Sequence, residues 1–347
     1  MRIIKKGLFA LLSLLLLVTG CAKVQTSAVT DRSDNNSEII PETTAEISTE
    51  TDDGEDEALT EEVSEEEVVT EPEAEPEPFE FNPHVYTELM SEYCTKEMWD
   101  SFYNMIDAIR AGGDTFECSD EKAYEWCLDP CTIGNYYPPA CTLVVGDGYE
   151  NGVGRLAYKM DKEEFAARAE AFEEEITRMV NEAVRSDYSE FEKVMCMYEY
   201  MCRNFVYDYE PLDGQGIDDF STYACLMKKN GICCEIASAY TYLLYQCGVE
   251  AIHYGQGAYH DWVYVVVGGK GYHVDPTWAL HGENPDYYLY LQYFMMTEEE
   301  RISQGFDRDK FEVGELWYLM PDYDLERYSA TDETFKPLHC NAYFEGM

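Results

Sequence analysis

"GICCEIASAYTYLLYQCGVE", residues 231–250, places two cysteines side by side directly after a glycine, at the start of an apolar pattern with helical spacing. A helix advances about 100° per residue, so Cys233 lies near the centre of the apolar stripe and Cys234 lies on its flank. We therefore expect Cys233 to face another layer of the protein. A helix N-terminus also favours a thiolate, because it supplies N–H groups and partial positive charge. Cys233 is a candidate nucleophile; the alternative is that it is only the first core residue of an amphipathic helix.

A hairpin follows in "HDWVYVVVGGKGYHVDPTW", residues 260–278. With a two-residue turn at Gly269–Lys270, strand alternation puts Asp275 opposite Tyr264 and on the same face as His260. In that register His260 and Asp275 are roughly 13 Å apart along the strand. A bulge, a register shift or strong twist must then bring the imidazole and the carboxylate together.

Each of these polar residues also has a simpler interpretation. A histidine at the start of a strand is often only a partly exposed polar residue, and an aspartate before a proline often forms a turn. His253 and His273 compete with His260 as the basic partner of a thiol, although His273 is expected to face away from Asp275.

Three motifs in order resemble the transglutaminase-like superfamily, whose members share a papain-like fold. They are "GICCEIA" (231–237), "HDWVYV" (260–265) and "GKGYHVDPTW" (269–278). The resemblance extends over about 188–300, and the cysteine doublet departs slightly from the family's pattern. The family's catalytic residues fall here on Cys233, His260 and Asp275.

The resemblance implies acyl transfer on a peptide or protein amide. The Cys233 thiolate would attack the carbonyl to form a thioester, with His260 as its proton partner and Asp275 orienting the imidazole. The backbone N–H of Cys233 is a candidate donor to the oxyanion, and Tyr223 is a second candidate. Hydrolysis is favoured over crosslinking. No cofactor is implied, and we find neither a calcium-loop motif nor a zinc pattern around "CLDPC", 127–131.

A binding module is the alternative from a different class. Many exported proteins use a catalytic fold for recognition, and the chain's 29 tyrosines could serve a catalytically silent surface that binds peptide or glycan.

The N-terminus reads as an export signal. "MRIIKKGLFALLSLLLLVTGC" has a basic start and an apolar run too short to span a bilayer of roughly 30 Å. Its end, "LVTGC", resembles the lipobox of bacterial lipoproteins. That predicts a signal over 1–20 and a lipid on Cys21, which would anchor the protein to the outer face of a bacterial membrane. The alternative is an ordinary secretory signal with a chance cysteine.

Strong acidity characterises the rest of the chain. Residues 22–80 hold 21 Asp or Glu against 2 Lys or Arg, which predicts a disordered stalk over 21–80. The whole chain has a formal net charge of −46, which argues against nucleic acid or anionic lipid as partners. Export permits disulfides among the twelve cysteines other than Cys21, but does not require them.

Helical patterns come first and strand patterns follow, which indicates an α+β fold with the cysteine-bearing helix packed on an antiparallel sheet. Helices are expected over 84–112, 161–186, 188–204 and 297–304, and a strand–turn–strand over 141–160. We divide the globular part into an N-terminal helical and strand region (81–187), a transglutaminase-like core (188–305) and a C-terminal extension (306–347).

Overall fold

The structure is a computed structural model, and it describes residues 76–209, 221–257, 259–281, 289–314, 316 and 323–339. The predicted signal, Cys21 and nearly all of the predicted stalk lie outside the described residues. Within the described ranges, helices pack on two antiparallel sheets, and β4 and β5 form a short parallel pair, so the α+β prediction is confirmed.

The helices are α2 (Lys96–Arg110), α3 (Glu121–Cys127), α4 (Pro130–Tyr136), α5 (Lys162–Ala183), α6 (Glu190–Asn204), α7 (Thr222–Lys228), α8 (Cys233–Gln246), α9 (Pro276–Ala279) and α10 (Glu298–Ser303). The strands are β1 (Thr115–Glu117), β2 (Val144–Glu150), β3 (Val153–Tyr158), β4 (Val206–Tyr207), β5 (Asn230–Gly231), β6 (Ala251–Gly255), β7 (Asp261–Val267), β8 (Lys270–Val274) and β9 (Glu312–Val313). Short 3₁₀ turns are η1 (Glu88–Met90), η2 (Pro138–Ala140), η3 (Leu291–Tyr293), η4 (Arg308–Lys310), η5 (Leu325–Tyr328) and η6 (Lys336–His339).

Helix boundaries follow the capping residues in the sequence. The α6 helix opens with a capping box, in which the Ser189 side chain accepts from the backbone N–H of Glu192 and the Glu192 carboxylate accepts from that of Ser189. The predicted helix over 84–112 is too long at its start, because the side chain of Thr95 caps α2 and the helix begins only at Lys96.

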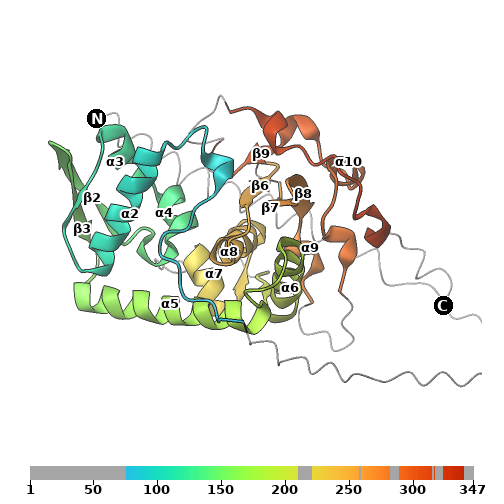
Figure 1. The fold of residues 1–347 in the computed structure, drawn as a ribbon, viewed down its shortest axis with the longest axis horizontal. Helices are drawn as coiled ribbons and strands as arrows, with labels where there is room; N and C mark the ends of the chain where they lie inside the picture. Colours follow the sequence, from blue (N-terminus) through green and yellow to red (C-terminus); the bar gives the residue numbers. More distant parts are fainter. Residues whose placement is uncertain are drawn as a thin grey trace, which may run out of the picture.

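The central element is α8, which packs on the four-stranded sheet of order β8-β7-β6-β9 (Figure 1). The α6 and α7 helices pack against α8, and α5 runs along the edge of the molecule beneath them (Figure 1). At the far end, α2, α3 and α4 lie beside a second sheet of order β1-β3-β2.

One hydrophobic core connects these parts. Its buried side chains come from both sides of the predicted boundary at 187/188. Across that boundary, the rings of Tyr136 in α4 and Tyr245 in α8 stack with their centroids 5.6 Å apart. The N-terminal region therefore buries one flank of the cysteine-bearing helix.

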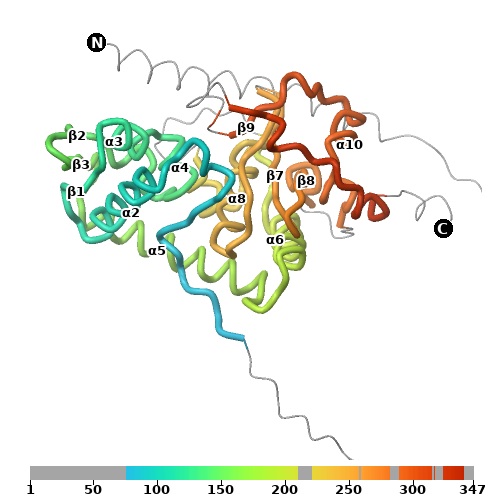
Figure 2. Tube along the Cα trace, turned by 45° about the horizontal axis from the view of Figure 1, so that its top comes forward, coloured from blue at the N-terminus to red at the C-terminus, as the bar shows by residue number. Residues whose placement is uncertain are grey.

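The first described residues form an extended N-terminal segment, 76–87, that crosses α5 and continues between α2 and α8 (Figure 2). The backbone N–H of Phe79 donates to the Asn181 side chain of α5 over 2.8 Å. Further along, the backbone N–H of Asn82 donates to Oε1 of Gln246, and Nε2 of Gln246 donates back to the carbonyl of Asn82. This segment thereby joins α5 to the last residue of α8.

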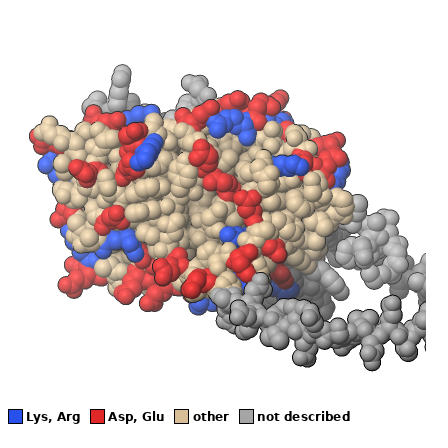
Figure 3. Space-filling view, in the orientation of Figure 1, with Lys and Arg blue, Asp and Glu red and all other residues tan. Residues whose placement is uncertain are grey.

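Acidic side chains are spread over the surface shown in Figure 3, with basic side chains scattered among them. Within the described part of the chain, no helix has both the length and the apolar character that crossing a membrane requires.

Candidate active site

The start of α8 is fixed by a buried carboxylate. Glu235, the third residue of the helix, accepts from the backbone N–H of Ile232 at 3.1 Å and from that of Ser221 at 2.8 Å. Glycine is needed at position 231, because a Cβ there would come within 3.0 Å of the Glu235 side chain. Burial raises the pKa of Glu235 to about 7. The carboxylate ties the first turn of α8 to the N-cap of α7 and so fixes where Cys233 lies.

Cys233 and Cys234 differ less in burial than the helical pattern predicted. Their exposed fractions are 1% and 9%, because every residue of α8 is buried, the flank included. The flank of α8 on which Cys234 was expected is therefore buried too, and α4, α6 and α7 are among the elements that contact this helix. The pKa of the Cys234 thiol is raised well above its usual value by its hydrogen bond with Cys233 and by burial.

The hairpin brings His260 and Asp275 together. Its two-residue turn is Gly268–Gly269, not Gly269–Lys270, and both glycines have the positive φ that such a turn requires. Val263 therefore pairs with Val274, which moves Asp275 two positions closer to His260 than expected. His260 Nε2 donates to Asp275 Oδ2 over 2.8 Å. The predicted register was wrong. The structure shows a register shifted by two residues, and a register shift was one of the changes expected to bring His260 and Asp275 together.

His260 also reaches Cys233. The imidazole and the Cys233 thiol are hydrogen-bonded, and because Nε2 serves Asp275, Nδ1 is the nitrogen left for the sulfur. Burial of the ring disfavours its cation, but the Asp275 carboxylate and Cys233 together outweigh this and raise the pKa of His260 to about 9. The structure thus places the three predicted residues in one chain of contacts, and their catalytic roles remain a prediction.

Arg301 is a fourth member that the sequence reasoning missed. It lies in α10, and its Nη2 forms an ion pair with Asp275 Oδ2 at 3.1 Å, with neither side chain exposed. The other oxygen of Asp275 accepts from the backbone N–H of Trp278 and caps α9. The signal in the sequence was weak, since "TEEERI" reads as a short acidic surface helix.

Aromatic rings enclose these polar groups. The His260 ring stacks on Trp278 with centroids 5.0 Å apart and an interplanar angle of 24°. The guanidinium of Arg301 lies 4.2 Å from the ring centre of Trp262 and 4.1 Å from that of Phe306. Such rings hold both cations in place while excluding water.

The competing histidines have other partners. His273 is fully buried and accepts at Nδ1 from Trp262 Nε1 over 3.1 Å. Burial and the Arg301 and Arg308 cations lower the pKa of His273 far below its usual value. The expectation that His273 faces away from Asp275 is wrong, because residues two apart on a strand share a face. His253 instead contacts Ser238 at 3.2 Å.

Tyr223, the second candidate oxyanion donor, packs toward α5. Its ring stacks on Phe172 with centroids 5.6 Å apart, and the Arg168 guanidinium lies 3.4 Å from its centre. These contacts give no support to a role beside Cys233.

A separate groove, of about 1090 Å³, lies between α2 and α5. Its lining includes Arg110, Glu173 and Phe81, and none of the three predicted catalytic residues belongs to it. Among the described residues, no group of three or more His, Cys, Asp or Glu side chains is arranged to hold a metal ion.

The family comparison agrees with the motifs. Residues 177–276 match the model of the "Transglutaminase-like superfamily". This segment is similar to transglutaminase-like domains. The matched segment contains Cys233, His260 and Asp275, and the match ends before Arg301. The resemblance predicted from the sequence is therefore confirmed for this part of the chain.

Other comparisons add little to the transglutaminase-like assignment. A solved structure described as "a Putative Cysteine Protease from Cytophaga hutchinsonii" is similar at 14% sequence identity with a TM-score of 0.22. The similarity covers 40% of this chain and 62% of that chain, less than two thirds of its length. Comparison with curated proteins gives no match.

Proposed function

We propose that this protein is a cysteine-dependent acyl-transfer enzyme that cleaves, or transfers, a peptide or protein amide through a thioester. The observation that carries the proposal is the contact chain in which His260 joins the Cys233 thiol to the buried Asp275 carboxylate. A binding module has no need of this arrangement, in which a buried imidazole is held between a thiol and a carboxylate.

The first half of the reaction forms the thioester. His260 takes the Cys233 proton, and the thiolate attacks the amide carbon, so that a C–S bond forms. The imidazolium, stabilised by Asp275, then gives its proton to the departing amine as the C–N bond breaks. The partial positive charge at the N-terminus of α8 favours the thiolate and the negative oxygen of the tetrahedral intermediate.

The second half releases the acyl group. Water, deprotonated by His260, attacks the thioester, and the C–S bond breaks as Cys233 regains its proton. A primary amine in place of water would give transfer instead of hydrolysis. We favour hydrolysis, since no acceptor site for an amine is apparent in the motifs. Because only 1% of Cys233 is exposed, the surroundings of the sulfur must open before a substrate can reach it.

We also propose that the enzyme acts outside the cell. The "LVTGC" motif supports a lipid on Cys21, and the acidic composition of 22–80 supports an extended tether between membrane and domain. Metabolic labelling with a fatty-acid probe, with Cys21→Ala as control, tests this part of the proposal.

Alkylation of the folded domain tests the site. Iodoacetamide is added across pH 5–10, and each modified cysteine is mapped by mass spectrometry. We expect Cys233 to react well below pH 8.5, about the pKa of an ordinary thiol, and His260→Ala to abolish that reactivity. Cys196→Ala, which removes a half-buried cysteine of α6, is the control and should leave the Cys233 profile in place.

Activity gives the second test. Proteins and peptides are screened for amide cleavage and for incorporation of a labelled amine, with Cys233→Ala as the inactive variant. Survival of a measured activity in Cys233→Ala contradicts the mechanism. An inert Cys233, together with peptide or glycan binding that Cys233→Ala leaves unchanged, favours the binding module.

A further inference from the structure

One oxygen of Asp275 serves two cationic partners. Oδ2 accepts from His260 Nε2 at 2.8 Å and faces Arg301 Nη2 at 3.1 Å. The Asp275 and Arg301 side chains have no exposed surface, and that of His260 is 8% exposed. The ion pair therefore lies directly behind the imidazole, away from bulk water.

The guanidinium is held in one orientation by groups around it. Its Nη1 donates to Gln304 Oε1 over 2.7 Å, and the rings of Trp262 and Phe306 lie against its faces. Removing a cation from water is unfavourable, so a buried arginine persists only where a counter-charge is close. Burial, which outweighs the neighbouring Asp275 carboxylate, lowers the pKa of Arg301 to about 10, so the side chain stays charged at neutral pH.

We propose that Arg301 is a positioning residue of the Cys233 site, which pairs with Asp275 and holds it aimed at His260 while the catalytic proton moves. This inference rests on the proposed function, because it assigns a role in that same proton transfer. The family match ends at residue 276, so it does not include Arg301.

Arg301 balances the charge of Asp275 in both protonation states of His260. When Cys233 and His260 form a thiolate–imidazolium pair, Asp275 and Arg301 form a second pair, and the buried group is neutral. When His260 has given its proton to a leaving amine, Arg301 still neutralises Asp275. Without Arg301, the imidazolium would be the nearest cation to a buried carboxylate, and His260 would hold its proton more tightly.

Other charged and titratable groups also face this cluster, and they stay constant in the comparison of variants. Asp261, which precedes Trp262 on β7, interacts with both His260 and Cys233, and Tyr293 interacts with Arg301. His273 also interacts with Arg301.

The test separates charge from packing. Arg301→Met keeps a long apolar stem between the rings but removes the cation, and Arg301→Lys keeps a cation at the same place. The measurement is the pH titration of the His260 ring by NMR of histidine-labelled protein, with the signal assigned by its loss in His260→Gln. It needs no substrate.

We expect the His260 titration in Arg301→Met to move upward by about one pH unit, and that in Arg301→Lys to stay close to wild type. If Arg301 had only a structural role, both variants would be less stable, but the pH at which His260 titrates would stay the same. Titration of a folded Arg301→Met at or below the wild-type pH overturns the proposal.

A second variant covers the case in which Arg301→Met does not fold. Gln304→Met removes the partly exposed hydrogen-bond partner of Nη1 and leaves Arg301 present. We expect a shift in the same direction of about 0.3 pH unit; no shift in this variant contradicts the proposed role. These titrations need no substrate, so they give the same result whether or not the protein cleaves amides. A failure of the proposed function can therefore be told apart from a failure of the role proposed for Arg301.

Discussion

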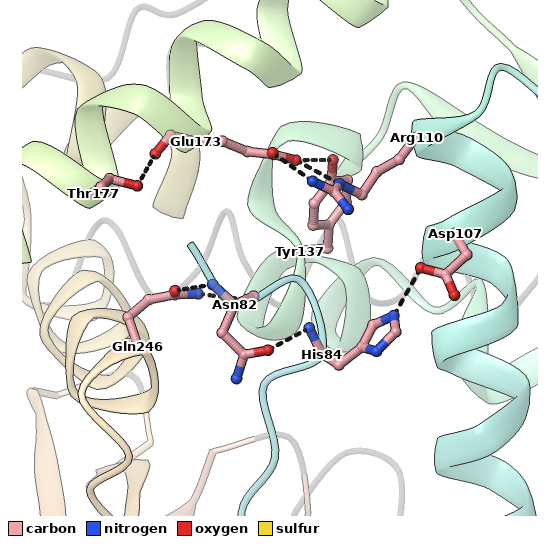
Figure 4. A network of polar contacts seen from close by, with 8 residues as sticks. All are labelled: Asn82, His84, Asp107, Arg110, Tyr137, Glu173, Thr177 and Gln246. Carbon is pink, nitrogen blue, oxygen red and sulfur yellow. Dashed lines mark hydrogen bonds and ion pairs between the residues drawn. The ribbon is translucent and has the colours of Figure 1, made fainter. Parts of the chain in front are cut away.

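Two polar networks in this molecule have similar ion-pair distances, but one is buried and the other is partly exposed to solvent. In the site, Asp275 meets His260 and Arg301 with no exposed surface on either acid or guanidinium. In the groove between α2 and α5, Arg110 donates twice to Glu173, at 2.9 and 2.8 Å, and these side chains are 38% and 19% exposed (Figure 4).

The two networks differ in which groups can compensate when one charged side chain is removed. Figure 4 shows Tyr137 also pointing at Glu173, so the groove carboxylate has several donors, and water can reach Arg110. In the buried network, water cannot solvate a charge that has lost its partner, because that charge stays in a low-dielectric interior. Similar contact distances should therefore have very different effects on stability.

The largest effect is expected for Asp275→Asn. This substitution leaves Arg301 buried without a counter-charge and His260 without its carboxylate. The free energy of unfolding should therefore fall by about 3–5 kcal/mol. Cys233 alkylation at pH 7 should slow at least about tenfold. Urea unfolding and the alkylation assay measure both, and a loss below about 1 kcal/mol would mean that the two charges are not truly desolvated.

The pH dependence of His260 comes next. Its folded pKa of about 9 is above its value of 6.5 in an unfolded chain. Its stabilising contribution is therefore fully present below pH 6.5 and is lost as pH rises through 9. Compared with His260→Gln, the wild type should be more stable by about 3 kcal/mol at pH 6 and by almost nothing at pH 10. An equal difference at both pH values would contradict the shift.

Glu173→Gln tests the groove and is the matched control for Asp275→Asn. The amide can still accept a hydrogen bond from Tyr137, and Arg110 gains access to water, so the loss should be about 1 kcal/mol. The alkylation profile of Cys233 should stay unchanged, because Glu173 does not touch the site. A changed profile would show that the two networks are coupled.

The smallest effect is expected at an exposed pair within one helix. Arg203 and Glu199 of α6 are one turn apart and more than two-fifths exposed on both sides. Arg203→Ala should cost about 0.3–0.5 kcal/mol in dilute buffer and almost nothing in 1 M salt, as measured by urea unfolding.

Local patterns predicted much of the fold. The helices over 161–186 and 188–204 were recognisable from their helical pattern, and the structure shows that Asp161 and Ser189 cap them. The register was missed for a local reason as well: a turn with two positive φ angles selects the glycine pair 268–269 over a glycine and a lysine.

What the sequence could not predict depends on distant packing. Nothing in "TEEERI" indicates that Arg301 is buried among aromatic rings, since Trp262 and Trp278 come from β7 and α9, and Phe306 lies beyond the end of α10. Likewise the helical wheel of α8 could not show that its flank is covered, because the cover comes from elements elsewhere in the chain.

The N-terminal segment has a mechanical consequence. Tension applied to the chain before residue 76 would first load the contacts at Ser186 and Asn181, and then those at Gln246. Gln246 is the last residue of α8, about 20 Å from Cys233 along the helix axis. A pull would thus be carried by α5 and by the far end of α8, so the geometry around the thiol is shielded from load until this segment peels away.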